Sequence, residues 1–161
     1  MSKLVLIIFL LLIPCPLSFA PGPPSTLELT YAAHTSDLSY ASKLTKCPEW
    51  IIQGIYTTES HRHMHAVGDN GESIGGFQHR RKYFDERCRK YFPYDPECYL
   101  QAACITGYII MDNLSFFKGD WTKAIASYNQ GVTGVLTNGV HMAYVNSIIR
   151  NGLFPCEEIM L

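Results

Sequence analysis

The sequence predicts a mostly α-helical domain that contains one small β-hairpin or Gly-rich loop. Apolar residues recur at helical spacing in several segments, most clearly over residues 48–59 and 97–114. One segment, residues 68–76, breaks this pattern because it is rich in glycine and carries an Asp-Asn pair. The chain has 161 residues, enough for one compact domain with a sizeable core.

The N-terminus has the layout of a secretory signal peptide. Lys3 precedes the apolar run Leu4–Ile13, which is short for a membrane span, and a Pro-containing stretch and the small-residue pattern Ser18-Phe19-Ala20 follow it. We therefore expect a signal peptide over residues 1–20, a linker over 21–34 and export to a periplasmic or extracellular location. The alternatives are a retained membrane anchor and a bacterial lipoprotein attached through Cys15.

Charge and cysteine content bear on partners and on redox state. Without Lys3 the chain has 12 Lys and Arg against 14 Asp and Glu, so nothing indicates attraction to nucleic acid or anionic lipid. An exported chain can form disulfides, and we expect Cys88–Cys98 and Cys47–Cys156, with Cys104 as a buried free thiol. No CxxC pair is present, which argues against a structural zinc site.

The first part of the domain contains two predicted helices. Ser36-Asp37 is expected to cap a short helix that runs to about Lys46. Pro48 then begins a stronger helix with Glu49 in its first turn. One face of this second helix carries the apolar residues Ile52, Ile55 and Tyr56. Glu59 lies on the same face, at the end of this apolar stripe.

Further helices are predicted along the rest of the chain. The charged segment 79–92 is expected to form a short helix. Asp95-Pro96-Glu97 is expected to start a central buried helix, and Asp120 to open another that Gly131 closes. The last helix is expected over Val140–Arg150, with Gly152 as its stop. The predicted buried stripe of the central helix has five members: Leu100, Cys104, Tyr108, Met111 and Leu114.

Glu59 is the candidate acid catalyst. A carboxyl group held against apolar side chains has a raised pKa, because burial disfavours the charged form. A glutamic acid that stays protonated near neutrality can donate its proton to a glycosidic oxygen. The alternative is an ordinary surface glutamate at a helix end, and the spacing alone does not decide between the two.

Four short motifs stand in a characteristic order. They are Glu59-Ser60, then residues 75–78 (GGFQ), then 126–131 (ASYNQG), then Tyr144-Val145. In this order they resemble the lytic transglycosylase domain, a family that cleaves bacterial peptidoglycan and is related to goose-type lysozyme. The likeness spans about residues 50–149 and implies a mostly α, lysozyme-like α+β fold over residues 35–161, with the hairpin beside a substrate cleft.

The resemblance also implies roles for individual residues. Glu59 would be the general acid and base, Tyr144 would hydrogen-bond it, and Asp69 would match an aspartate in the goose-type cleft. The other implied site residues would shape the cleft or bind substrate: Ser60, His61, Gly75, Gln78, Tyr128 and Asn129. Three positions depart from the family pattern, namely Gly76, Ser127 and Gln130, and His79-Arg80 stands where goose-type sequences have an apolar residue and a second aspartate.

These observations lead to one expected function and two alternatives. The expected activity is lytic transglycosylation of the β-1,4 bond between N-acetylmuramic acid and N-acetylglucosamine, by a monomer without cofactor or metal whose partner is the peptidoglycan strand. The alternatives are hydrolysis of the same bond by water and a non-catalytic peptidoglycan-binding module. His61, His63 and His65 could hold a metal only if the segment were extended, and we expect a solvated loop instead.

Overall fold

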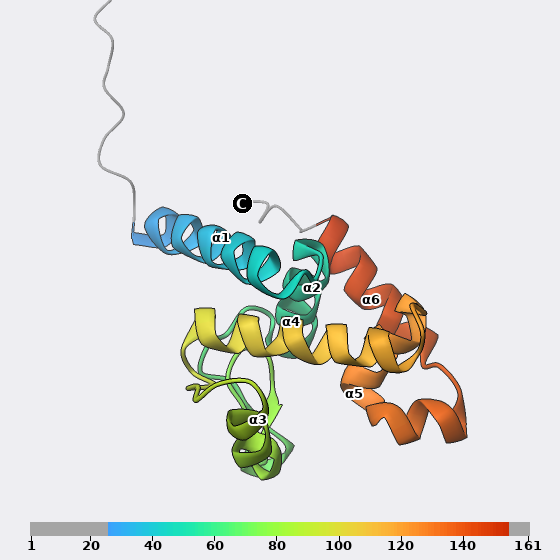
Figure 1. Ribbon diagram of the computed structural model, residues 1–161. Helices are drawn as coiled ribbons and strands as arrows, with labels where there is room; N and C mark the ends of the chain where they lie inside the picture. Colours follow the sequence, from blue (N-terminus) through green and yellow to red (C-terminus); the bar gives the residue numbers. More distant parts are fainter. Residues whose placement is uncertain (1–25, 155–161) are drawn as a thin grey trace, which may run out of the picture.

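The computed structural model describes residues 26–154, with side chains from Thr35 onward. Over these residues the protein is mostly helical with one small antiparallel sheet, as predicted (Figure 1). The predicted signal peptide, residues 21–25 and Cys156 lie outside this range. The elements are α1 Thr26–Thr45, α2 Glu49–Ser60, β1 Val67–Gly68, η1 Asp69–Gly71, β2 Ser73–Ile74, β3 His79–Arg80, η2 Arg81–Tyr83, α3 Phe84–Lys90, α4 Tyr99–Phe116, α5 Trp121–Asn138 and α6 Met142–Leu153.

Helix α1 begins at Thr26, so the predicted linker to residue 34 and the predicted start at Ser36-Asp37 are wrong. Residues 27–33 contain no Gly or Pro and include leucine, glutamate and alanine, which favour a helix. The helix therefore continues through the Ser-Asp pair. It ends close to the predicted point, where Lys46 takes a left-handed φ of 67°.

Helix α2 and helix α6 pack against each other more closely than ordinary side chains allow. A Cβ atom on Gly54 would overlap the carbonyl oxygen of Ile148, and one on Gly152 would overlap the carbonyl oxygen of Trp50. Gly152 is therefore a packing residue inside α6 and not the predicted helix stop. The two glycines bring together the helices that carry Glu59 and Tyr144.

Helix α4 is the central helix of the protein, as predicted. It packs against α1 and α5, and Figure 1 shows α1 on one side of it and α3 with the small sheet on the other. The helix begins at Tyr99, because Asp95 forms a turn just before it, accepting the Glu97 amide on Oδ1 (2.9 Å). Of the predicted stripe only Cys104 is buried, whereas every residue of the segment 102–107 is buried, so burial in this part of α4 is not confined to one face.

The Gly-rich segment forms the predicted hairpin and gains a third strand. Val67 pairs with Ile74, and Ile74 pairs with His79, so the strand order is β1-β2-β3. The predicted helix over 79–92 is shorter than expected because His79 and Arg80 belong to β3, and α3 starts only at Phe84.

Helix α5 is capped by Asp120, whose Oδ1 accepts the Lys123 amide (3.1 Å). At Gly131 the backbone leaves the helical region (φ 71°, ψ 159°), as predicted, but the chain resumes a helical course to Asn138. Helix α6 runs from Met142 to Leu153, slightly later than predicted. Within residues 26–154 no helix has the length and apolar character needed to cross a membrane.

The predicted Cys88–Cys98 disulfide is absent, and both thiols are free. The segment between them is held instead by Tyr94, whose ring packs on Phe84 (5.8 Å between centroids) and whose hydroxyl is 3.2 Å from His79 Nδ1. Cys104 is a buried free thiol, as predicted, and burial raises its pKa to about 11.

Candidate active site

Glu59 lies in the last turn of α2, at the end of a buried apolar face. Ile52 and Ile55 on that face are fully buried and Tyr56 nearly so, while Glu59 itself is partly buried. The helix ends at the next residue, Ser60, and is followed by His61, which adopts a left-handed conformation (φ 50°) and whose amide donates to the Thr57 carbonyl. The predicted position of the carboxyl group at the end of an apolar stripe is confirmed.

Tyr144 of α6 contacts the Glu59 carboxyl group directly. Its hydroxyl donates a hydrogen bond to Glu59 Oε1 (2.6 Å), and its ring is buried. Burial raises the pKa of Glu59, the hydrogen bond from Tyr144 opposes that rise, and the negative charge of Asp69 adds to it. The pKa of Tyr144 is also raised, chiefly by burial and then by the Glu59 charge, so the phenol remains a proton donor to the carboxylate.

Glu59 lines a cleft with a volume of about 900 Å³. Its lining residues come from the hairpin, η2 and α3, and from α4 and the middle of α5. The hairpin contributes Asp69, Ser73 and Gln78, while α5 contributes Tyr128 and Asn129. The basic and aromatic side chains of the wall formed by residues 80–91 are Arg80, Tyr83, Arg87, Lys90 and Tyr91.

Five of the predicted site residues line this cleft and one stands behind it. Glu59, Asp69, Gln78, Tyr128 and Asn129 face the cavity. Tyr144 reaches Glu59 from α6 and is not itself part of the cleft wall.

The other three predicted site residues do not line the cleft. Ser60 is buried and its hydroxyl donates to the Tyr56 carbonyl one turn earlier in α2 (3.0 Å). His61 is exposed and serves as the C-cap of α2. Gly75 is buried in a turn with φ 80°, where a Cβ atom would overlap the Pro96 carbonyl oxygen. All three support the backbone around the cleft instead of facing it.

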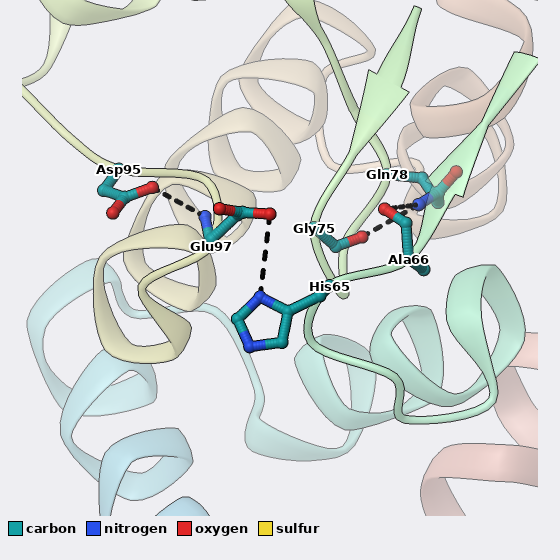
Figure 2. A network of polar contacts seen from close by, with 6 residues as sticks. All are labelled: His65, Ala66, Gly75, Gln78, Asp95 and Glu97. Carbon is teal, nitrogen blue, oxygen red and sulfur yellow. Dashed lines mark hydrogen bonds and ion pairs between the residues drawn. The ribbon is translucent and has the colours of Figure 1, made fainter. Parts of the chain in front are cut away.

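Gln78 combines a place in the cleft wall with a structural role. Figure 2 shows its side chain held against the hairpin, where Nε2 donates to the carbonyls of Gly75 (2.9 Å) and Ala66 (3.2 Å). The Oε1 atom of Gln78 occupies the space that a side chain at position 68 would need, and Gly68 leaves this space free. The backbone of Gln78 is left-handed (φ 49°). The hydrogen bonds of its side-chain amide therefore hold the turn between β2 and β3 in this conformation.

Asp69 is engaged by two neighbours. Ser73 Oγ donates to Asp69 Oδ2 (2.8 Å), and Arg80 Nη2 lies 3.5 Å from the same oxygen. Arg80 stands where goose-type sequences have their second aspartate. The cleft therefore has a carboxylate paired with a guanidinium at this place, and not the two carboxylates of the goose-type pattern.

Behind Gln78 lies a buried polar network that the sequence did not reveal. His79 is fully buried, with Nε2 3.0 Å from Thr106 Oγ1 and Nδ1 3.2 Å from the Tyr94 hydroxyl. Thr106 in turn lies 3.3 Å from the Tyr128 hydroxyl, which donates to the Phe77 carbonyl (2.8 Å). Burial, and then the positive charge of Arg87, lower the pKa of His79 well below its usual value, so the ring is neutral. The network joins the hairpin to α4 and α5.

Two of the departures from the family pattern have a structural reason. A side chain at Gly76 would overlap the ring of Tyr56, so the space of the usual leucine is already filled. Gln130 spans the turn between α5 and α6, donating Nε2 to the Gly139 carbonyl (3.1 Å) and accepting the His141 amide (2.8 Å). Ser127 donates to the Ala124 carbonyl within α5 (2.8 Å).

The histidine-rich segment 61–65 does not gather its side chains into a cluster. His65 Nδ1 pairs with Glu97 (3.6 Å), as Figure 2 shows, and His61 and His63 are exposed. Over residues 35–154 no group of three or more His, Cys, Asp or Glu side chains is placed to hold a metal ion.

Comparisons of the chain with known protein families, with curated proteins and with solved structures found no match. The fold and the cleft therefore have to be interpreted from their own chemistry.

Proposed function

We propose that the protein is a lytic transglycosylase that cleaves the β-1,4 bond between N-acetylmuramic acid and N-acetylglucosamine in peptidoglycan. The observation that carries the proposal is the partly buried Glu59 carboxyl group at the cleft, with a raised pKa and a hydrogen bond from Tyr144. A carboxylic acid of this kind is suited to protonate a glycosidic oxygen near neutral pH. The open shape and the size of the cleft fit a polymeric glycan better than a small enclosed ligand.

The proposed reaction uses one carboxyl group twice. Glu59 first donates its proton to the glycosidic oxygen, and the bond from that oxygen to the anomeric carbon breaks. The resulting carboxylate then accepts the proton of the muramic C6 hydroxyl as this oxygen attacks the anomeric carbon, which closes a 1,6-anhydro ring. Tyr144 stabilises the intermediate carboxylate because its hydroxyl donates to Oε1.

Hydrolysis by water is the alternative outcome at the same site. It would require a group that orients the water, and Asp69 is the candidate. The Ser73 and Arg80 contacts to Oδ2 favour a structural role for this carboxylate, which supports transglycosylation. A non-catalytic binding module is the other alternative, but a binding role gives no reason to place an acid of raised pKa at the cleft.

The proposal extends to location and partners. The expected partner is the peptidoglycan strand, and the expected place of action is the periplasm or the outside of the cell, because the N-terminal sequence has the pattern of an export signal. A monomer is sufficient for the chemistry, since Glu59 and the cleft belong to one chain.

A pair of isosteric variants tests the proposal. Glu59→Gln keeps an acceptor for the Tyr144 hydroxyl but cannot transfer a proton, so we expect release of soluble fragments from purified peptidoglycan to stop. Glu72→Gln makes the same change at an exposed carboxyl outside the cleft and should retain full activity. Thermal unfolding of both variants serves as the folding control. Equal activity of Glu59→Gln and the wild type would refute the catalytic role.

A further inference from the structure

The charges along the cleft are unevenly paired. Arg80 faces Asp69 (3.5 Å), and Lys90 Nζ lies 2.5 Å from Asp112 Oδ2. Arg87 also lines the cleft, but no carboxylate lies within ion-pair distance of it among the residues that the structure describes. The neighbouring Glu86 lines the same cleft but forms no ion pair with it, so among the described residues Arg87 is a cleft cation without an ion-pair partner.

The surroundings of Arg87 make this unpaired charge costly. One of its guanidinium nitrogens, Nη1, is buried and has no hydrogen-bond partner. The guanidinium carbon lies 5.5 Å from the centroid of the Tyr83 ring, and the side chain also hydrogen-bonds Tyr94. A buried donor that bonds to nothing costs free energy, and an anion in the cleft would offset the charge of the same guanidinium.

Helix α3 brings a second cation and a carboxylate to the same cleft, namely Lys90, which is paired with Asp112, and Glu86. Lys90 is three residues after Arg87 along α3, so these two side chains project from the same face, and both line the cleft. Tyr91 fixes this wall against α4, because its hydroxyl donates to Asp112 and its ring stacks on Tyr108 (5.4 Å between centroids, 11° between planes). The basic wall is therefore held in place beside the cleft that contains Glu59.

We infer that Arg87, assisted by Lys90, forms a subsite for a carboxylate carried by the bound glycan. This inference rests on the proposed function and specifies the substrate as a carboxylate-bearing saccharide and not a neutral one. A guanidinium can bind a carboxylate through two parallel hydrogen bonds, which supplies both charge and acceptors. On a peptidoglycan strand such a carboxylate is the lactyl group of a muramic residue that carries no peptide; where a peptide is attached through that group, the free carboxylates belong to the peptide.

Binding to the inactive full-length protein tests the subsite without depending on cleavage. Glu59→Gln is titrated with a neutral N-acetylglucosamine oligomer and with muramic-containing oligomers of the same length, with and without peptide. The measured quantity is the ratio of the neutral to the charged Kd. Adding Arg87→Gln should lower this ratio about tenfold. Adding Arg89→Gln, an equal charge change on the exposed part of α3, should leave it unchanged.

The outcomes separate this inference from the proposed function. Preference for the peptide-free muramic oligomer would identify the lactyl carboxylate, and preference only with peptide would identify the peptide carboxylates; both support the subsite. Binding of both glycans with an unchanged ratio in Arg87→Gln would overturn the subsite alone. Binding of neither glycan would overturn both proposals.

A second measurement covers the case in which Arg87→Gln does not fold. The Kd ratio of the Glu59→Gln protein is then measured from about 50 mM to about 500 mM salt. A subsite based on charge predicts that the preference for the charged oligomer falls as salt rises, because exposed ion pairs are screened. A preference that does not change with salt would overturn the inference.

Discussion

Tyr144→Phe should move the alkaline limit of activity to higher pH. The substitution keeps the buried ring and removes only the hydroxyl that donates to Glu59 Oε1 (2.6 Å). That hydrogen bond stabilises the charged carboxylate and so lowers the pKa of Glu59 against the larger effect of burial. Without it the pKa of Glu59 rises further, and the protonated, proton-donating form persists to higher pH.

The size of this effect follows from the hydrogen bond that is lost. A hydrogen bond to a charged group contributes about 1.5–3 kcal/mol, and one pKa unit corresponds to about 1.4 kcal/mol. The full shift would therefore be about one to two units. Glu59 is only partly buried, so water replaces part of the lost interaction and we expect a shift of about one unit.

The assay is the pH dependence of kcat/KM for fragment release from purified peptidoglycan. The limb that falls as pH rises reports the group that must be protonated in the free enzyme. Tyr40→Phe is the matched control, because Tyr40 is an exposed tyrosine of α1 outside the cleft. An alkaline limb that stays in place in Tyr144→Phe, or moves to lower pH, would refute the assignment of Glu59 as the general acid.

Three further predictions follow from contacts around the site. Asp69→Asn removes a negative charge that raises the pKa of Glu59, so the same limb should move to lower pH, by less than in Tyr144→Phe, and an upward shift would contradict this account. Gly54→Ala places a Cβ atom on the Ile148 carbonyl oxygen and should lower the free energy of unfolding by about 1–3 kcal/mol in urea titrations, while Gly134→Ala, which meets only the Gln130 side chain, should cost less. His79 has a lowered pKa in the folded state, so the unfolded chain takes up its proton first and the folded protein loses stability as pH falls below about 6.5. In His79→Gln the midpoint of urea unfolding should therefore depend less on pH between about 7 and about 5. An unchanged pH dependence would exclude His79 as the cause of the acid destabilisation.

The parts of the site that depend on local sequence could be predicted. The spacing of Ile52, Ile55, Tyr56 and Glu59 defines one helix face and places the glutamate at the end of an apolar stripe, although the spacing alone does not show that its carboxyl group is partly buried. The hairpin was predictable in the same way, since glycines beside an Asp-Asn pair tolerate left-handed backbone.

The parts that depend on distant contacts could not be derived from spacing. Tyr144 is 85 residues from Glu59, and only the resemblance indicated their contact. Gly152 looked like a helix stop because glycine often ends helices, but the approach of Trp50 requires a residue without a Cβ atom there. The resemblance implies that Ser60 belongs to the cleft, but its side chain is directed instead by the hydrogen bond to the Tyr56 carbonyl.

The basic wall of the cleft shows a second limit. The segment that carries Arg87 and Lys90 was predicted as a short charged helix, and a solvated charged face is the usual interpretation of such a pattern. What places these cations in the cleft is the attachment of the segment to the rest of the fold through Tyr91 and Tyr94. The signal available in the sequence was the alternation of tyrosines with arginines and lysines.

The most direct test of the account is mass spectrometry of the soluble products from purified peptidoglycan. We predict that the wild type releases fragments that end in 1,6-anhydromuramic acid, and that Glu59→Gln releases none. Fragments with reducing muramic ends would show that water, and not the C6 hydroxyl, completes the reaction at Glu59. Absence of fragments from the folded wild type, or the same fragments from both proteins, would contradict the central claim that Glu59 catalyses glycan cleavage.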